Sequence, residues 1–221
     1  MSFEDVIARI EHQANTLVWW SPDQIARGEH LANNPTKGER PWSIPHKTGV
    51  FLHDMVLHRK PHTILELGTS IGYSTAWLAH AAQTYGGHVY TVERQPHKYE
   101  IAQQNLADAG LLDTVSMYNA EISAILHRLE LMPELSSIDM VFLDADRGRY
   151  HEYIPLIKNH LAPGVVLVAD NAGNMANRMQ PFFDLLTAEG WDYIVHDFDN
   201  GILVATPPMV PLPNKEHGDP F

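Results

Sequence analysis

The feature that most constrains the fold of this chain is a regular alternation of short apolar runs with helical stretches, which starts at Thr63. Apolar runs that stay hydrophobic throughout are typical of parallel strands buried on both faces of a sheet. The expected strands are 63–68, 88–93, 114–118, 138–144 and 165–170, and the expected helices between them are 72–83, 96–109, 121–131 and 150–161. This alternation predicts an α/β fold with helices on both faces of a mostly parallel sheet.

The chain then departs from this pattern. A helix expected over 179–189 leads to two further strands, 191–198 and 201–206. The turn Asp199-Asn-Gly201 between these strands is a hairpin signal. The sheet is therefore expected to have seven strands and to end in an antiparallel hairpin.

Length and composition fit one domain. The 221 residues are 44% hydrophobic and 19% charged, which is a globular composition. We expect a single domain over 1–206, made of a helical N-terminal extension (1–60) and an α/β core (61–206). Helices are expected over 1–13, after Ser21 and over 46–59, with a loop over 33–45. The last segment, 207–221, contains five prolines and is expected to be a tail.

Charge and residue usage exclude several classes of function. Acidic residues outnumber basic ones by 27 to 15, which gives a formal charge of −12 and disfavours nucleic acid or anionic lipid as a partner. The absence of cysteine excludes disulfides, thiolate nucleophiles and cysteine-held metal clusters. We expect a cytoplasmic protein, because no signal peptide is evident and no apolar run approaches the roughly 20 residues of a membrane span.

A glycine loop follows the first strand of the core. Gly68 and Gly72 let the backbone turn sharply and approach a ligand at the carboxyl end of the sheet. The third glycine of the dinucleotide motif is missing, and Glu66 would suit an ammonium group better than a pyrophosphate. Glu93, at the end of the second strand, can accept hydrogen bonds from ribose hydroxyls. Together these residues predict a ribose-bearing cofactor without a diphosphate; a tight turn and a solvated strand end are the alternatives.

Oxygen-bearing side chains end the fourth and fifth strands. Asp144 follows one, and Asp170 and Asn171 follow the other. Because neighbouring parallel strands lie about 4.8 Å apart, these side chains can converge on one point. Two carboxylates and an amide oxygen suit Mg²⁺, and Ca²⁺ or Mn²⁺ could use the same set. The alternative is that these residues only cap the following helices.

Four segments carry a resemblance to a known family. LELGTSIGYSTAWLA, VYTVER, FLDADRGRY and VLVADN occur in this order, and the stretch from about Trp42 to Thr206 resembles the S-adenosylmethionine-dependent, divalent-metal-dependent O-methyltransferases. These include catechol and caffeoyl-coenzyme A O-methyltransferases and small bacterial relatives. The resemblance implies a Rossmann-like class I methyltransferase fold. It also implies methyl transfer to a hydroxyl of a small, catechol-like vicinal diol, with a metal that orients and acidifies the acceptor.

The resemblance also implies roles for individual residues. The cofactor-binding positions are Ile44, Glu66, Gly68, Thr69, Ser74, Glu93, Glu121, Ile122 and Asp146. The metal ligands are Asp144, Asp170 and Asn171, and the catalytic positions are Asp144 and Arg147. The residues around position 120 depart from the family's usual Gly-Asp-Ala. Many relatives are dimers through N-terminal helices, and we expect a homodimer here.

One further departure concerns the proton of the acceptor hydroxyl. The family commonly has lysine where this chain has Arg147, and arginine stays protonated, so it is a poor general base. It can still stabilise a developing phenolate. His151 is another candidate base, although a surface position is the favoured interpretation of it. Trp42 is a candidate for the substrate pocket.

Three other functions stay open at this point. Some bacterial relatives modify hydroxylated bases of transfer RNA, which the charge of −12 disfavours. A non-catalytic protein that binds S-adenosylmethionine is consistent with Arg147. A nicotinamide-dependent oxidoreductase could use a similar sheet, but the missing third glycine and the acidic strand ends disfavour it.

Overall fold

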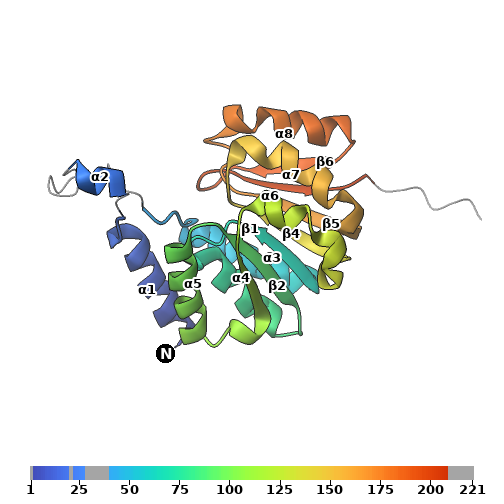
Figure 1. Cartoon of the computed structure of the whole chain (residues 1–221). Coiled ribbons are helices and arrows are strands. Elements are labelled where there is room, and N and C mark those ends of the chain that lie inside the picture. Colours follow the sequence, from blue (N-terminus) through green and yellow to red (C-terminus); the bar gives the residue numbers. More distant parts are fainter. Residues whose placement is uncertain (1, 20–21, 28–39, 209–221) are drawn as a thin grey trace, which may run out of the picture.

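The computed structural model describes residues 2–19, 22–27 and 40–208 (Figure 1). Most of the expected loop over 33–45 and nearly all of the expected tail over 207–221 lie outside the described residues. No helix within the described ranges is both long enough and apolar enough to cross a membrane.

A seven-stranded sheet forms the centre of the molecule, as the sequence predicts. The strands are β1 (Thr63–Leu67), β2 (His88–Glu93), β3 (Val115–Asn119), β4 (Ile138–Leu143), β5 (Leu161–Ala169), β6 (Asp192–His196) and β7 (Ile202–Thr206). Their order is β3-β2-β1-β4-β5-β7-β6. The first five strands pair in parallel, whereas β7 is antiparallel to both β5 and β6. The C-terminal hairpin is therefore confirmed.

Helices cover both faces of the sheet (Figure 1). The α-helices of the described ranges are α1 (Phe3–Thr16), α2 (Pro22–Ala26), α3 (His46–Arg59), α4 (Tyr73–Gln83), α5 (Pro96–Asp108), α6 (Ile122–Leu126), α7 (Tyr150–Ile157) and α8 (Ala176–Ala188). Of these, α2 contributes none of its described side chains to the two cores beside the sheet. Side chains of α6, α7 and α8 pack with Leu65 and Val141 in one core. Side chains of α1, α3, α4 and α5 pack with Ile64 and Phe142 in the other. Alternate residues of β1 and β4 therefore face opposite layers, which explains why these strands read as continuously apolar.

Several element bounds differ from the sequence prediction. The helix expected over 150–161 ends at Ile157, and a 3₁₀ turn over Lys158–His160 leads directly into β5. The helix expected over 121–131 ends at Leu126, because the amide of Arg128 bonds to the carbonyl of Ile125 and tightens the chain into short 3₁₀ turns. These turns bury Leu129 and Leu135. Strand β5 begins at Leu161, four residues before the expected 165. Its register shifts by a bulge against β4, where Gly164 has φ +79°.

Backbone hydrogen bonds connect the carboxyl ends of neighbouring central strands in series. The amide of Gly68 donates to the carbonyl of Val92 at 3.2 Å, and the amide of Asp144 donates to that of Leu67 at 3.1 Å. The amide of Asp170 continues the series to the carbonyl of Leu143 at 3.1 Å. The loops after β1, β4 and β5 are consequently held next to one another at a single edge of the sheet.

Candidate active site

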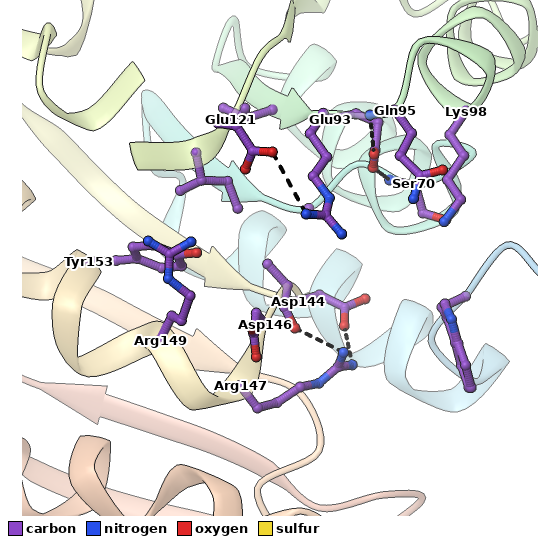
Figure 2. A pocket seen from close by; sticks show the side chains of 16 residues that line it. Ser70, Glu93, Gln95, Lys98, Glu121, Asp144, Asp146, Arg147, Arg149 and Tyr153 are labelled. Atoms are coloured by element: carbon purple, nitrogen blue, oxygen red, sulfur yellow. Dashed lines mark hydrogen bonds and ion pairs between the residues drawn. The ribbon is translucent and has the colours of Figure 1, made fainter. Parts of the chain in front are cut away.

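A pocket of about 260 Å³ lies at this edge, and Figure 2 shows its lining. Residues at or after the ends of β1, β2 and β3 form one side, and residues that follow β4 form the other. The lining includes seven residues predicted from the sequence, namely Gly68, Glu93, Glu121, Ile122, Asp144, Asp146 and Arg147. Trp42 also lines the pocket, as proposed for a substrate-facing residue, and its surface is 74% exposed.

The glycine loop packs directly against the Asp144 turn. Gly68 has φ +113°, and a Cβ placed on it would lie 2.2 Å from the carbonyl oxygen of Asp144. No residue other than glycine fits both this conformation and this contact. The loop that would face a cofactor and the turn that carries Asp144 are thus in backbone contact.

Glu93 is fixed at the pocket wall by two backbone hydrogen bonds. Its Oε2 accepts from the amide of Ser70 at 2.9 Å, and its Oε1 accepts from the amide of Gln95 at 2.8 Å (Figure 2). Each carboxylate oxygen has capacity for a further donor, because an ionised carboxylate can accept about four hydrogen bonds. The side chain is therefore an oriented acceptor at the edge of the pocket.

Glu66 lies behind the loop and is fully buried. Its carboxylate accepts hydrogen bonds from Ser74 Oγ at 2.5 Å, Thr75 Oγ1 at 2.5 Å and Thr91 Oγ1 at 2.6 Å. Burial raises the pKa of Glu66 to about 7, although the three hydroxyl donors act in the opposite direction. This network ties β1, β2 and the first turn of α4 together beneath the pocket.

The predicted metal ligands meet at the ends of β4 and β5, with Arg147 between them. One terminal nitrogen of Arg147 donates to Asp144 Oδ1 at 2.7 Å and also donates to Asn171 Oδ1. The other terminal nitrogen donates to the carbonyl of Ala145 at 2.9 Å (Figure 2). Asn171 has φ +66°, a left-handed conformation that asparagine tolerates better than most residues. The structure thus brings Asp144, Arg147 and Asn171 together.

Two acidic side chains, Asp144 and Asp170, lie at the ends of β4 and β5 beside the single guanidinium of Arg147. Burial raises the pKa of Asp144, while the guanidinium of Arg147 opposes the shift. Burial, and then the charge of Asp144, raises the pKa of Asp170 to about 7. The Oδ1 of Asp170 is buried and accepts no hydrogen bond from the described residues. The described part of the chain contains no group of three or more His, Cys, Asp or Glu residues that could hold a metal. The predicted ligand set consists of two carboxylates and one amide.

Four predicted cofactor residues do not line the pocket. These residues are buried in the structure but absent from the lining, namely Ile44, Glu66, Thr69 and Ser74. His151 is not in the lining either, and its Nδ1 is buried without a hydrogen-bond partner in the described structure. A role for His151 as the base that receives the acceptor's proton therefore gains no support.

The lining also contains residues that sequence reasoning missed, namely Ser70, Val92, Arg94, Gln95, Lys98, Ala145, Arg149 and Tyr153. Several of them are adjacent in sequence to predicted positions, which is the signal that could have found them. Arg94 follows Glu93 and lies 3.7 Å from Glu121. Asp146 pairs with Arg178 of α8 at 3.1 Å. The lining thus has four basic side chains beside four acidic ones, in a protein in which acidic residues outnumber basic ones by 27 to 15.

Comparison with known proteins agrees with this geometry. A family model described as a methyltransferase domain matches residues 65–172, from β1 to just beyond β5. The fold and the pocket at the strand ends are thus those of a methyltransferase domain.

The relatives in sequence are more specific. The chain is 32% identical over 167 residues to the catechol O-methyltransferase of Niastella koreensis, and this match covers 75% of the chain and 73% of the relative. The chain is also 33% identical over 135 residues to the catechol O-methyltransferase of Sus scrofa, and this match covers 60% of the chain and 72% of the relative. The chain belongs to the catechol O-methyltransferase-like family of S-adenosylmethionine-dependent O-methyltransferases. This membership favours transfer to a small hydroxylated molecule over a nicotinamide-dependent oxidation.

Solved structures show the same fold. The O-methyltransferase of Bacillus cereus in complex with SAH superposes with a TM-score of 0.67 at 24% identity, over 93% of this chain and 100% of that chain. At this identity the likeness establishes the architecture alone.

Proposed function

We propose that the acceptor is a catechol-like vicinal diol and that a divalent metal, Mg²⁺ before Mn²⁺ or Ca²⁺, is held by Asp144, Asp170 and Asn171. The observation that carries this proposal is the buried Asp170 Oδ1, which lacks a partner in the described structure and lies near the carboxylate of Asp144, whose side chain is only 10% exposed. An uncompensated carboxylate is costly in a protein interior, and a hard cation would compensate it. The donor set therefore fits such an ion.

The same geometry supports a place for the cofactor. Gly68 would let the backbone approach the cofactor closely, and Glu93 would accept the ribose hydroxyls with the capacity that its two amide bonds leave free. Glu121 and Ile122 would border the adenine, and Asp146 would contact the cofactor from the other wall. The buried network of Glu66 and Ser74, to which Thr69 is linked through Thr91, would hold the methionine end of the site in shape.

The main requirement for methyl transfer is that the protein aligns the acceptor oxygen with the methyl group of the cofactor. The methyl group of a sulfonium is already activated for in-line attack, so a correctly placed acceptor oxygen gains most of its rate from orientation. In the reaction the new oxygen–carbon bond forms as the sulfur–carbon bond breaks, the sulfonium becomes a neutral thioether, and the hydroxyl proton passes to solvent. A divalent ion, when bound, supplies Lewis acidity and a template for two adjacent oxygens.

The chain's own residues then have separate tasks. Asp144, which contacts the glycine loop through its backbone, joins the metal position to the cofactor position. Arg147 stays protonated and can stabilise negative charge on the acceptor oxygen, but it cannot receive the proton. Trp42 offers an exposed aromatic face at the mouth of the pocket.

Transfer of a labelled methyl group from S-adenosylmethionine tests the proposal. Catechol should be methylated, while phenol and resorcinol, which lack adjacent hydroxyls, should be poor acceptors. A chelator should abolish the transfer, and Mg²⁺ should restore it. Activity that is indifferent to chelation would disprove the metal role. Cofactor binding without transfer to any vicinal diol would favour the non-catalytic alternative.

A further inference from the structure

The guanidinium of Arg147 lies on two of the three oxygen donors that the proposed metal site requires. A single nitrogen donates both to Asp144 Oδ1 at 2.7 Å and to Asn171 Oδ1. These oxygens come from different strand ends, so the arginine bridges β4 and β5. The Arg147 and Asp144 side chains are 22% and 10% exposed, which means that the pair is shielded from bulk water. Charge-assisted hydrogen bonds are stronger in such surroundings than at an open surface.

We propose that Arg147 is a built-in competitor for the divalent ion: its guanidinium holds Asp144 and Asn171 in the metal-free protein and must leave them when the ion binds. This inference rests on the metal site of the proposed function. Two cations on the same pair of oxygens would repel each other strongly in a partly buried site. Occupancy by the guanidinium and occupancy by the ion therefore exclude each other.

Arg147 competes with the metal and does not permanently take its place, because the arginine leaves one oxygen of the Asp170 carboxylate without a partner in the described structure. Asp170 is buried and the side chain of Asp144 is 10% exposed, so two carboxyl groups, which can carry one negative charge each, share a shielded site. One guanidinium offsets one of these charges. The Oδ1 of Asp170 receives no hydrogen bond from Arg147 or from any other described residue. The site therefore keeps a demand for a further cation that the arginine does not meet.

The chemistry of arginine also determines how Arg147 would release Asp144 and Asn171. Arginine does not lose its proton in proteins, so the side chain must move rather than become neutral. Arg147 lines the pocket of about 260 Å³, which gives the displaced guanidinium a space to enter. Metal affinity in this chain would then be lower than the three oxygens alone would give, because binding includes the loss of the arginine's hydrogen bonds.

Direct measurement of Mn²⁺ binding to the cofactor-free, full-length protein tests this inference without an activity assay. Free Mn²⁺ can be followed by electron paramagnetic resonance, and the heat of binding by calorimetry. In Arg147→Met the affinity should rise by about tenfold or more, which corresponds to the loss of one charge-assisted hydrogen bond.

Arg149→Met is the matched control. Arg149 lines the same pocket, but its Nε donates to Glu152 at 2.9 Å and it does not contact Asp144 or Asn171 in the described structure. The control removes the same charge from the pocket, so a purely long-range effect would raise the affinity in both variants. We expect a change within about twofold for Arg149→Met, because exposed ion pairs contribute little.

The outcomes separate the inference from the proposed function. Tighter binding in Arg147→Met alone supports the inference, including the case in which the wild-type protein binds no measurable Mn²⁺. Wild-type binding that Arg147→Met does not improve, or that Arg149→Met improves equally, overturns the inference and leaves the metal site standing. Absence of binding in every protein overturns both. Thermal unfolding checks that each variant folds, and Arg147→Gln replaces Arg147→Met if that variant does not.

Discussion

Replacement of Glu66 by glutamine should change how the stability of the protein depends on pH. Glu66 is fully buried beneath the glycine loop and accepts hydrogen bonds from Ser74, Thr75 and Thr91. A glutamine has the same shape and can exchange hydrogen bonds with the same hydroxyls, which are free to rotate. Glu66→Gln therefore removes the ionisation and keeps the packing.

The sign and size of the effect follow from the pKa. Burial raises the pKa of Glu66 from 4.5 to about 7. Between these values the folded protein keeps a proton that the unfolded chain has released, so stability falls as pH rises. The slope is about 1.4 kcal/mol per pH unit, which amounts to about 3 kcal/mol over the window. Below the window both states are protonated, and above it both are ionised, so the contribution of Glu66 is constant there.

Urea unfolding of the cofactor-free protein between about pH 5 and pH 8 measures this difference. The free energy of unfolding of the wild type should fall relative to that of Glu66→Gln by about 2–3 kcal/mol across the range. Glu189→Gln is the control, because the hydrogen bond from Lys158 lowers the pKa of Glu189. Its stability contribution is lost only at pH values below this window, so its curve should run parallel to that of the wild type. Parallel curves for Glu66→Gln as well would refute the reasoning.

Three further substitutions test other parts of the account. Gly68→Ala should lower the stability by about 2 kcal/mol or more, because the new Cβ would lie 2.2 Å from the carbonyl oxygen of Asp144 and φ is +113°. Thermal unfolding measures this change, and an unchanged melting temperature would contradict the packing of the loop. Gly49→Ala should also destabilise the protein, by about 1–2 kcal/mol, although alanine favours helices, because its Cβ would lie 2.3 Å from Trp77 Nε1; a stabilised variant would show that Trp77 yields freely. Glu93→Gln should weaken SAH binding by about tenfold in calorimetry, because a carboxylate accepts from ribose hydroxyls more strongly than an amide, and equal affinity would remove Glu93 from the cofactor site.

Much of the sheet could be predicted because its signals are local. Apolar runs bounded by turn residues mark the strands, and the turn at Asp199 and Gly201, both with positive φ, marks the hairpin. The beginning of β5 was not predicted, because Pro163 and Gly164 look like a loop when they are read alone. They belong to the strand only because β4 provides a partner across the bulge.

The candidate site was predictable only as far as strand ends fix positions. Glu93, Asp144 and Asp170 end strands or follow them directly, so the order of the motifs along the chain brings them to one edge of the sheet. The bridge from Arg147 to Asn171 joins residues 24 positions apart. It depends on the direction of a long side chain in the folded pocket, and no pattern in the sequence encodes that direction.

We propose that Asp170 binds the metal that orients the acceptor and that it does not contribute to cofactor binding. Methyl transfer to catechol and SAH affinity, measured side by side for the wild type and Asp170→Asn, test it most directly. We predict that transfer falls by about a hundredfold or more, while SAH affinity stays within about twofold. A variant that transfers methyl groups at the wild-type rate, or that loses SAH binding in proportion to its activity, would contradict the account.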